Sequence, residues 1–408
     1  MKASLEKFRI GDIIYLLGLY VMLISQYLTV ISNIKYIGAA FCLAYLLMPG
    51  KNNFDKKYYR WILLFNIFFI LSFLWSLNIR VSGIVVLVHL IPYYLLTFAT
   101  IKYFNSYQKL DNILIAVFVC GLILIVYVAS NMEEFMLGAR FGSGLIDDDA
   151  EERFWNVNTI GMCFSYSILA GLVLFNKKNV GLIRKVLFIS SFILMGFASL
   201  LTGSRKALLM MAIPIFYFSY KRLKKYFLLG LAVLIVVVGV SYYLMMNVEA
   251  LYETIGYRTI DMINILTGNE TGFEDNSRLR LTQLGIKWWQ DNPILGVGIN
   301  CFKVLSNADA QFRGKMFYAH NNYVELLVDV GLVGFILYYR GYYYLLKESL
   351  KKKSEAMSCV FIMTIMVLAL DTGNVSYYDM RVQLLLVILF GILRLEKKKN
   401  IIKNYEAS

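Results

Sequence analysis

Histidine and cysteine, on which much enzyme chemistry depends, are scarce in this sequence. Its 408 residues include 2 histidines and 5 cysteines. Four cysteines fall in apolar stretches, Cys301 stands alone in a polar one, and no C-x-x-C or cysteine–histidine cluster occurs. A disulfide needs a partner on the same side, and a structural zinc site needs four closely spaced ligands. The sequence therefore predicts no disulfide framework, no metal site and no cofactor.

Charged residues are also few. They make up 17% of the chain, below the roughly 25% of soluble domains, while hydrophobic residues make up 59%. The apolar residues come in blocks of roughly 17–25, the length that a helix needs to cross a bilayer. We predict an all-α polytopic membrane protein, in which residues 1–408 form a single transmembrane domain of about twelve helices. The predicted spans lie at about 10–30, 33–49, 61–78, 83–101, 111–129, 156–175, 186–202, 206–220, 226–246, 322–346, 356–372 and 380–395.

Charge indicates the orientation of these spans. If the N-terminus is cytoplasmic, lysines and arginines crowd every short inner loop, as the positive-inside rule predicts, and both termini lie inside. The net charge of +14 is then a topology signal, and no nucleic-acid partner is needed to explain it. Arg340 is a basic residue that falls within a span. The first block is expected to remain as a span, because it is long and no small-residue cleavage site follows it.

Two features of the sequence lack the pattern of a ligand site. The acidic run at 147–152, in a predicted outer loop, lacks the alternating ligands of an EF-hand, so a solvated lid is favoured over a metal site. The glycines at 296 and 298 suit a tight turn but lack a dinucleotide fingerprint.

His89 lies within a span, where an ionisable residue is a functional candidate. A neutral histidine bonded to a neighbouring helix is the favoured interpretation.

The longest polar segment is a predicted extracytoplasmic loop at 247–321. A helix capped at Asp275 or Ser277 is expected to run to about Gln290. Arg278 and Arg280 are two residues apart, so they point to roughly opposite sides of it, and only one can face a given site.

Two further predicted helix starts carry polar groups. Ser204 is expected to cap a helix that begins with Arg205 and Lys206, two cations at the positive end of a helix dipole. A bound anion and simple snorkelling to the headgroups both explain them. Further on, Asn322 is expected to be an N-cap, with Glu325 as its capping-box partner.

That role leaves His320, which precedes the cap, unexplained. Arg205, Arg278 and His320 are all expected at or just before a helix N-terminus on the outer side. They would form a strong anion site if the fold brings them together.

Four motifs carry a family resemblance. They are G-S-R-K-A at 203–207, S-R-x-x-x-x-x-x-G at 277–285, N-P-I-L-G-V-G-x-x-x-F at 292–302 and A-H-N-N-Y-V-E-L-L-V-D-V-G-L-V-G at 319–334. In this order they resemble the O-antigen polymerase and ligase superfamily of bacterial envelope enzymes. The motif-bearing part covers about a third of the chain.

The resemblance implies a GT-C-like architecture and an inverting, metal-independent glycosyltransferase in the bacterial plasma membrane. Its substrate would be an undecaprenyl-diphosphate-linked oligosaccharide, and a chain-length regulator is a possible protein partner. Arg205 and Arg278 match the positions that bind the diphosphate, and His320 matches the one that activates the acceptor. Glu325 or Asp329 would orient His320, with Lys206 and Asn321 as further supporting candidates.

Within this family the pattern favours a polymerase of repeat units over a ligase that transfers glycan to lipid A core. A flippase for the same lipids is the main alternative of another class. It is disfavoured because the two halves show no repeat and few charges lie deep within spans. A scaffold without enzyme activity would leave the two arginines and the histidine without a purpose.

Overall fold

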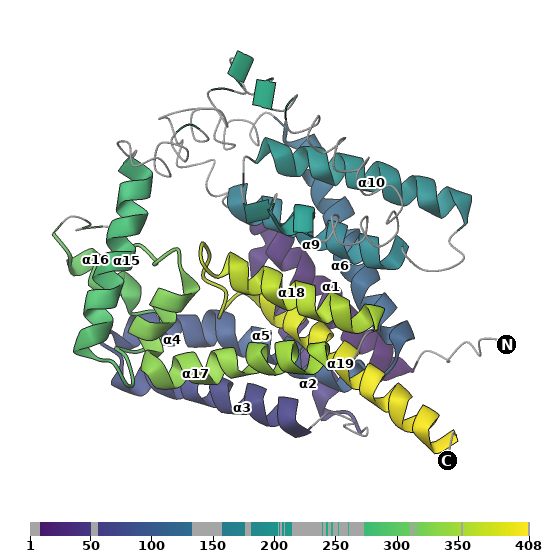
Figure 1. Cartoon of the computed structure of the whole chain (residues 1–408), viewed down its shortest axis with the longest axis horizontal. Coiled ribbons are helices and arrows are strands. Elements are labelled where there is room, and N and C mark those ends of the chain that lie inside the picture. The colour runs from purple at the N-terminus through teal and green to yellow at the C-terminus, as the bar shows by residue number, and fades with distance from the viewer. Residues whose placement is uncertain are drawn as a thin grey trace. The chain divides into compact units, whose positions relative to one another are not determined.

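The computed structural model describes residues 9–49, 56–132, 157–175, 181–202, 273–310, 316–351 and 354–406, with isolated positions between 204 and 260 and at 312 and 314. These residues form helices and turns, and no strand occurs among them. The α-helices are α1 (Ile10–Tyr27), α2 (Lys35–Leu47), α3 (Lys56–Leu71), α4 (Ile79–Val85), α5 (Ile91–Tyr103), α6 (Tyr107–Ser130), α9 (Val157–Phe175), α10 (Leu182–Leu201), α15 (Phe273–Asp291), α16 (Phe302–Ala308), α17 (Asn322–Leu350), α18 (Glu355–Leu370) and α19 (Met380–Glu406) (Figure 1). Short helical turns lie at Thr29–Ile34, Ser72–Trp75 and Val86–Leu90.

Much of the predicted membrane domain is present as helices. Six segments are long and apolar enough to cross a bilayer: Ile10–Tyr27, Ile79–Tyr103, Tyr107–Ser130, Asn158–Phe175, Leu182–Ser199 and Asn322–Leu350. Shorter apolar helices cover Ile31–Leu47, Arg60–Trp75 and Glu355–Leu370. These coincide with predicted spans, and the predicted span 380–395 is helical within α19. This pattern fits a multi-pass membrane protein.

The remaining predicted spans, 206–220 and 226–246, lie mostly outside the described residues, as does the acidic run at 147–152. The number of twelve spans therefore stays a prediction.

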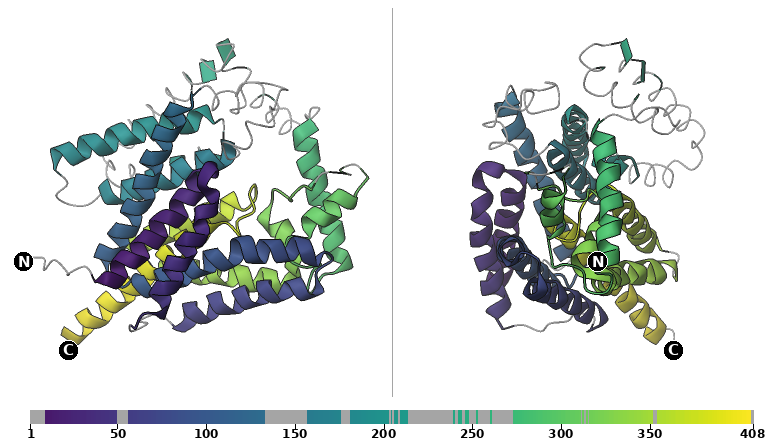
Figure 2. Two further views of the ribbon diagram at one scale, coloured as in Figure 1. Left: turned by 180° about the vertical axis from the view of Figure 1, so that it is seen from behind. Right: turned by 90° about the vertical axis from the view of Figure 1, so that its left-hand side faces the viewer.

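The chain forms two compact units. One consists of Met1–Met22, Asn33–Ile113 and Ser277–Ser408, and the other of Leu23–Ser32 and Leu114–Asn276. In the first, α17 packs against α3, α18 and α19, and α5 packs against α2 and α19; α3 and α17 run side by side (Figure 2). A Cβ atom at Gly341 would overlap the ring of Trp61, so glycine lets α3 and α17 approach closely. The Nε1 atom of Trp61 donates to the carbonyl oxygen of Leu337 at 2.6 Å, which fixes this contact.

In the second unit, α9 packs against α10. Gly171 of α9 leaves room for two aromatic rings, because a Cβ atom there would come within 2.8 Å of both Phe118 and Phe192. Close packing of this kind is how helices associate in lipid, where the hydrophobic effect between helices is absent.

His89 lies in the turn Val86–Leu90, and its Nδ1 atom is 3.3 Å from the hydroxyl oxygen of Tyr93. Tyr93 is one turn further along the same helical segment. The histidine is therefore hydrogen-bonded, as expected, but to its own segment. The predicted partner on a neighbouring helix was wrong, because a side chain four residues on is already within reach.

Helix α17 is broken one third of the way along its length. Gly331 has φ 63° and ψ −170°, a conformation that is essentially restricted to glycine. The break frees carbonyl groups on its N-terminal side. The backbone N–H of Val297 donates to the carbonyl of Val328 at 2.9 Å, and that of Gly298 donates to the carbonyl of Asp329 at 2.8 Å.

The same loop also satisfies the other side of the break. The N–H groups of Leu332 and Val333 donate to the carbonyls of Pro293 and Ile294 at 2.9 and 3.2 Å. The loop at 293–298 therefore lies within the break of α17 and replaces the missing helical hydrogen bonds. Two of the sequence motifs, 292–302 and 319–334, are in this way one structural unit.

We predict that Gly331→Ala lowers the free energy of unfolding by at least about 2 kcal/mol, because alanine disfavours this backbone conformation and its Cβ would overlap the carbonyl of Ile294. Gly83→Ala is the matched control: Gly83 lies in α4 with open space around it. That change is expected to be neutral or to stabilise by about 1 kcal/mol. Thermal unfolding of the purified variants measures both, and equal midpoints would contradict the role given to the break.

Candidate functional site

The carboxylate of Asp329 ties three parts of the chain together. It is fully buried, and it accepts hydrogen bonds from the N–H groups of Asn300 at 2.9 Å and Phe302 at 2.7 Å. It also accepts one from the hydroxyl of Tyr377 at 2.9 Å. Burial raises the pKa of Tyr377 well above its usual value, so this phenol stays a neutral donor. Asp329, expected as an orienting group for His320, thus holds the 300–302 turn and the loop after α18.

The first turn of α17 differs in detail from the expectation. The N-cap is Asn321, whose Oδ1 atom accepts from the N–H groups of Tyr323 at 3.0 Å and Val324 at 3.3 Å. Asn322 was predicted to cap but is the first helical residue. Its Oδ1 atom instead accepts from the N–H groups of Ser376 and Tyr377. Either asparagine suits a cap locally, and the distant partners of Asn322 decide between them.

Glu325 does not close a capping box. It is fully buried, and its Oε2 atom accepts from the N–H of Ala319 at 2.7 Å. Its Oε1 atom has no hydrogen-bond partner within the described part of the chain. The carboxylate therefore fixes the backbone that immediately precedes His320.

His320 lies between these two fixed points. The bond from Ala319 to Glu325 holds the chain on one side, and the Asn321 cap holds it on the other. The histidine has φ 53°, which is uncommon for a residue other than glycine. Its ring is half-buried, and its centroid is 3.9 Å from that of Tyr318. A side chain held in a strained backbone conformation is a frequent feature of functional sites.

Arg278 is carried by α15, which spans Phe273–Asp291 and so begins slightly before the predicted start. Arg278 is half-buried, and Arg280 is exposed. The prediction that the two arginines lie on different sides is confirmed. Gly285 lies two helical turns after Arg278 on the same side of α15, and a Cβ atom there would overlap the side chain of Val324. The side of α15 that carries Arg278 therefore packs against the first turn of α17.

One apolar cluster joins the elements that carry Arg278 and His320. Its buried members come from α15, from the segment that follows it, and from the start of α17: Leu281, Leu284, Val297, Cys301, Phe302, Phe312, Ala319, Val324 and Val328. Ala319 directly precedes His320, and Leu281 is one turn from Arg278. Three of the four sequence motifs thus meet in one cluster.

The fourth motif belongs to the other compact unit. Arg205 lies outside the described residues. Lys206 is half-buried, and the Oγ atom of Ser204 accepts from the N–H of Ala207 at 3.4 Å, in keeping with the predicted cap. The convergence of Arg205 with Arg278 and His320 stays a prediction.

Two features near His320 were missed at the level of sequence. Lys303 of α16 lies with its Nζ atom 5.9 Å from the ring centroid of Tyr378, and its charge acts on the carboxylates of Glu325 and Asp329. Tyr378 belongs to the loop between α18 and α19, where Arg381 and Asp379 form an ion pair at 2.7 Å. A polar run at 371–381 between the last two apolar stretches was the available signal. In the described part of the chain, no group of three His, Cys, Asp or Glu side chains is arranged to hold a metal ion.

The described residues form an all-helical membrane protein. In it, the elements that carry His320 and Arg278 pack together at the N-terminal end of α17. Residues 190–339 match the family model Wzy_C, described as O-antigen ligase. The match includes Arg205, Arg278 and His320, and it confirms the resemblance: the chain carries a domain of the O-antigen polymerase and ligase superfamily. No curated protein matches the chain.

We predict that Asp329→Asn lowers the free energy of unfolding by about 3 kcal/mol, because an amide cannot accept all three hydrogen bonds. Tyr377→Phe removes one donor and should cost about 1 kcal/mol. Asp291→Asn, at an exposed aspartate on α15, is the control and is expected to change nothing. Thermal or denaturant unfolding measures the series. A variant of Asp329 as stable as that of Asp291 would show that the buried carboxylate does not hold the loops.

Proposed function

We propose that the protein is an inverting, metal-independent glycosyltransferase that polymerises undecaprenyl-diphosphate-linked oligosaccharide repeat units on the outer face of the plasma membrane. The carrying observation is the position of His320, fixed on both sides at the start of α17 and close to the helix that bears Arg278. The proposal includes the GT-C-like arrangement of twelve spans and the outer loop at 247–321. A chain-length regulator is a proposed partner.

The proposed reaction forms one bond and breaks one. A hydroxyl oxygen of the acceptor sugar attacks the anomeric carbon of the donor from the side opposite the diphosphate. The bond from that carbon to the diphosphate oxygen breaks, and His320 takes the hydroxyl proton as general base. Arg205 and Arg278 neutralise the charge that develops on the diphosphate, since guanidinium groups match phosphate oxygens in a bidentate manner. No general acid is then needed.

The supporting residues act through position. Asn321 and Glu325 hold the backbone on either side of His320. Asp329 holds the 300–302 turn that precedes Lys303. In this proposal, Lys206 adds positive charge beside Arg205. A site made of several preorganised groups stabilises developing charge without reorganisation during the reaction.

Transfer to lipid A core is the second candidate, and the description of the matching family as O-antigen ligase favours it. The two functions differ only in the acceptor. Purified protein is incubated with undecaprenyl diphosphate oligosaccharide alone, and separately with lipid A core added, and the glycans are resolved on a gel. A ladder from the donor alone supports the polymerase. Product that requires lipid A core supports the ligase and overturns the polymerase.

We predict that His320→Asn lowers the rate of transfer at least about 100-fold with the protein still inserted and folded. Asparagine tolerates positive φ better than alanine, so this change removes the base and keeps the backbone. Activity within a few-fold of the parent would exclude His320 as the base.

For the diphosphate-binding arginines, we predict that Arg205→Ala and Arg278→Ala abolish product, whereas Arg280→Ala has a mild effect. Arg280 is exposed on the same helix as Arg278 and is the matched control. The measurement is the same gel assay at equal amounts of membrane-inserted protein. Equal loss from Arg278→Ala and Arg280→Ala would contradict the assignment of one helix face to the substrate.

A further inference from the structure

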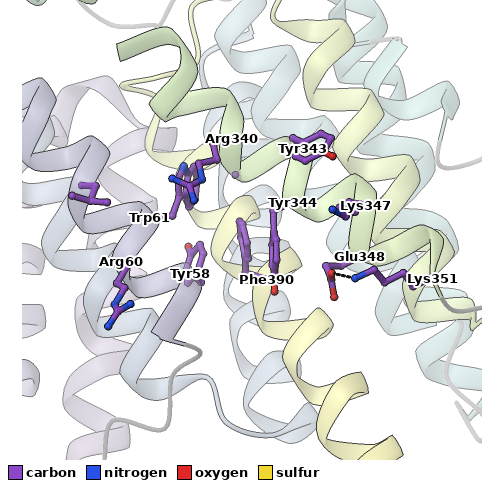
Figure 3. A pocket seen from close by; sticks show the side chains of 12 residues that line it. Tyr58, Arg60, Trp61, Arg340, Tyr343, Tyr344, Lys347, Glu348, Lys351 and Phe390 are labelled. Carbon is purple, nitrogen blue, oxygen red and sulfur yellow. Dashed lines mark hydrogen bonds and ion pairs between the residues drawn. The ribbon is translucent and has the colours of Figure 1, made fainter. Parts of the chain in front are cut away.

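A cavity of about 530 Å³ lies between α3, α17 and α19 (Figure 3). Its lining residues on α17 belong to the C-terminal half of that helix, whereas His320 precedes the N-terminal end. Four of its lining residues are cations: Arg60 on α3, and Arg340, Lys347 and Lys351 in or directly after α17. Spacings of seven and four residues put the last three on one face of the helix. In the predicted topology this is the cytoplasmic end of the spans.

The positive charge in this cavity is only partly neutralised. Among the described residues that line it, the acidic one is Glu348, which forms ion pairs with Lys351 and with Lys397, the latter at 2.6 Å. Among the described residues, no carboxylate pairs with Arg340, Lys347 or Arg60, and the side chain of Arg340 is exposed within a predicted span. A cation within a span that no carboxylate neutralises is costly, and such a residue is a functional candidate.

Aromatic rings also line the cavity. The ring of Phe390 stacks on Tyr344 at a centroid distance of 6.0 Å, and it lies 3.9 Å from Tyr58 and 5.3 Å from Trp61. Figure 3 shows the rings of Tyr58, Phe390 and Tyr344 between Arg60 of α3 and Lys347 of α17. The Nε1 atom of Trp61 already donates to the backbone of α17, so the indole presents an apolar surface. The lining of the cavity thus combines cationic and aromatic side chains.

An apolar track leads out of the cavity along α3. Leu64 lines the cavity and is 53% exposed, and Ile67 and Leu71 are each 45% exposed. Their spacing of three and four residues puts them on one side of the helix, towards the middle of the predicted span. A ligand that fills both parts needs an anionic head and a hydrocarbon chain.

We propose that this cavity binds the headgroup of an anionic phospholipid of the inner leaflet. Arg340 and Lys347 contact the phosphate diester, Arg60 and Lys351 lie at the rim, and an acyl chain follows Leu64, Ile67 and Leu71. Guanidinium and ammonium groups are the usual partners of lipid phosphates, and basic pockets between membrane helices on the cytoplasmic side bind such headgroups. The site is independent of the transfer reaction proposed at the other end of α17.

The test uses the full-length protein, purified in detergent, stripped of lipid and titrated with phosphatidylglycerol or phosphatidylethanolamine under native mass spectrometry. The parent is expected to retain one phosphatidylglycerol and to bind phosphatidylethanolamine at least tenfold more weakly. The double variant Arg340→Gln with Lys347→Gln should lose at least tenfold in affinity for phosphatidylglycerol. Arg184→Gln with Lys185→Gln removes the same charge from exposed residues of α10 and should bind like the parent.

Two arms separate a lipid from free phosphate and from misfolding. Leu64→Asn keeps the charge and changes an exposed side chain, and it should weaken phosphatidylglycerol binding several-fold. Inorganic phosphate should neither displace the lipid nor raise the thermal midpoint of the stripped protein. Equal binding of both lipids, equal loss in both double variants, unchanged binding by Leu64→Asn, or displacement by inorganic phosphate would each overturn the proposal.

Discussion

The break in α17 at Gly331 is the constraint on which the first unit depends. Where no water is at hand, backbone N–H and C=O groups need partners within the protein, so an interrupted membrane helix is stable only if another segment supplies them. The loop at 293–298 does so on both sides of the break. Each irregular segment therefore makes the other possible. The glycines at 296 and 331 are needed because the two backbones touch.

This pairing also builds the neighbourhood of His320. The loop in the break continues into the 300–302 turn, whose N–H groups are held by Asp329. It is preceded by α15, which carries Arg278 and packs through Gly285 on the first turn of α17. The imidazole of His320 is thus carried by a segment that hydrogen bonds hold in place. A fixed position of this kind is a condition for preorganised electrostatic catalysis. Distortion at Gly331 would reach His320 without any change in a site residue.

Local patterns in the sequence were sufficient for much of this structure. Block lengths predicted the positions of the apolar helices, and helical periodicity separated the sides of Arg278 and Arg280. The break at Gly331 and the choice of Asn321 as N-cap could not be predicted from local sequence patterns. Both depend on partners distant in sequence. The break is satisfied by the loop at 293–298, and Asn322 is held by the N–H groups of Ser376 and Tyr377, 54 and 55 residues further on. Neither pairing leaves a periodic trace. The motifs marked the right segments because they contain the glycines, but they do not state which segments touch.

Arg340 is a charged residue within a predicted span, and its position needs a physical explanation. It lies about 9 Å of helix rise inside residue 346, the predicted end of the span. A long side chain at that depth can reach towards the headgroups, and such snorkelling is the simplest explanation of a lone arginine. Snorkelling alone is unfavourable for Arg340, because Lys347 and Lys351 lie on the same face of α17, at the predicted headgroup level. A guanidinium that extends towards them approaches two like charges, of which Glu348 neutralises one. An anion placed between Arg340 and Lys347 removes this repulsion, and a lipid phosphate beside an apolar wall is the anion that a membrane supplies.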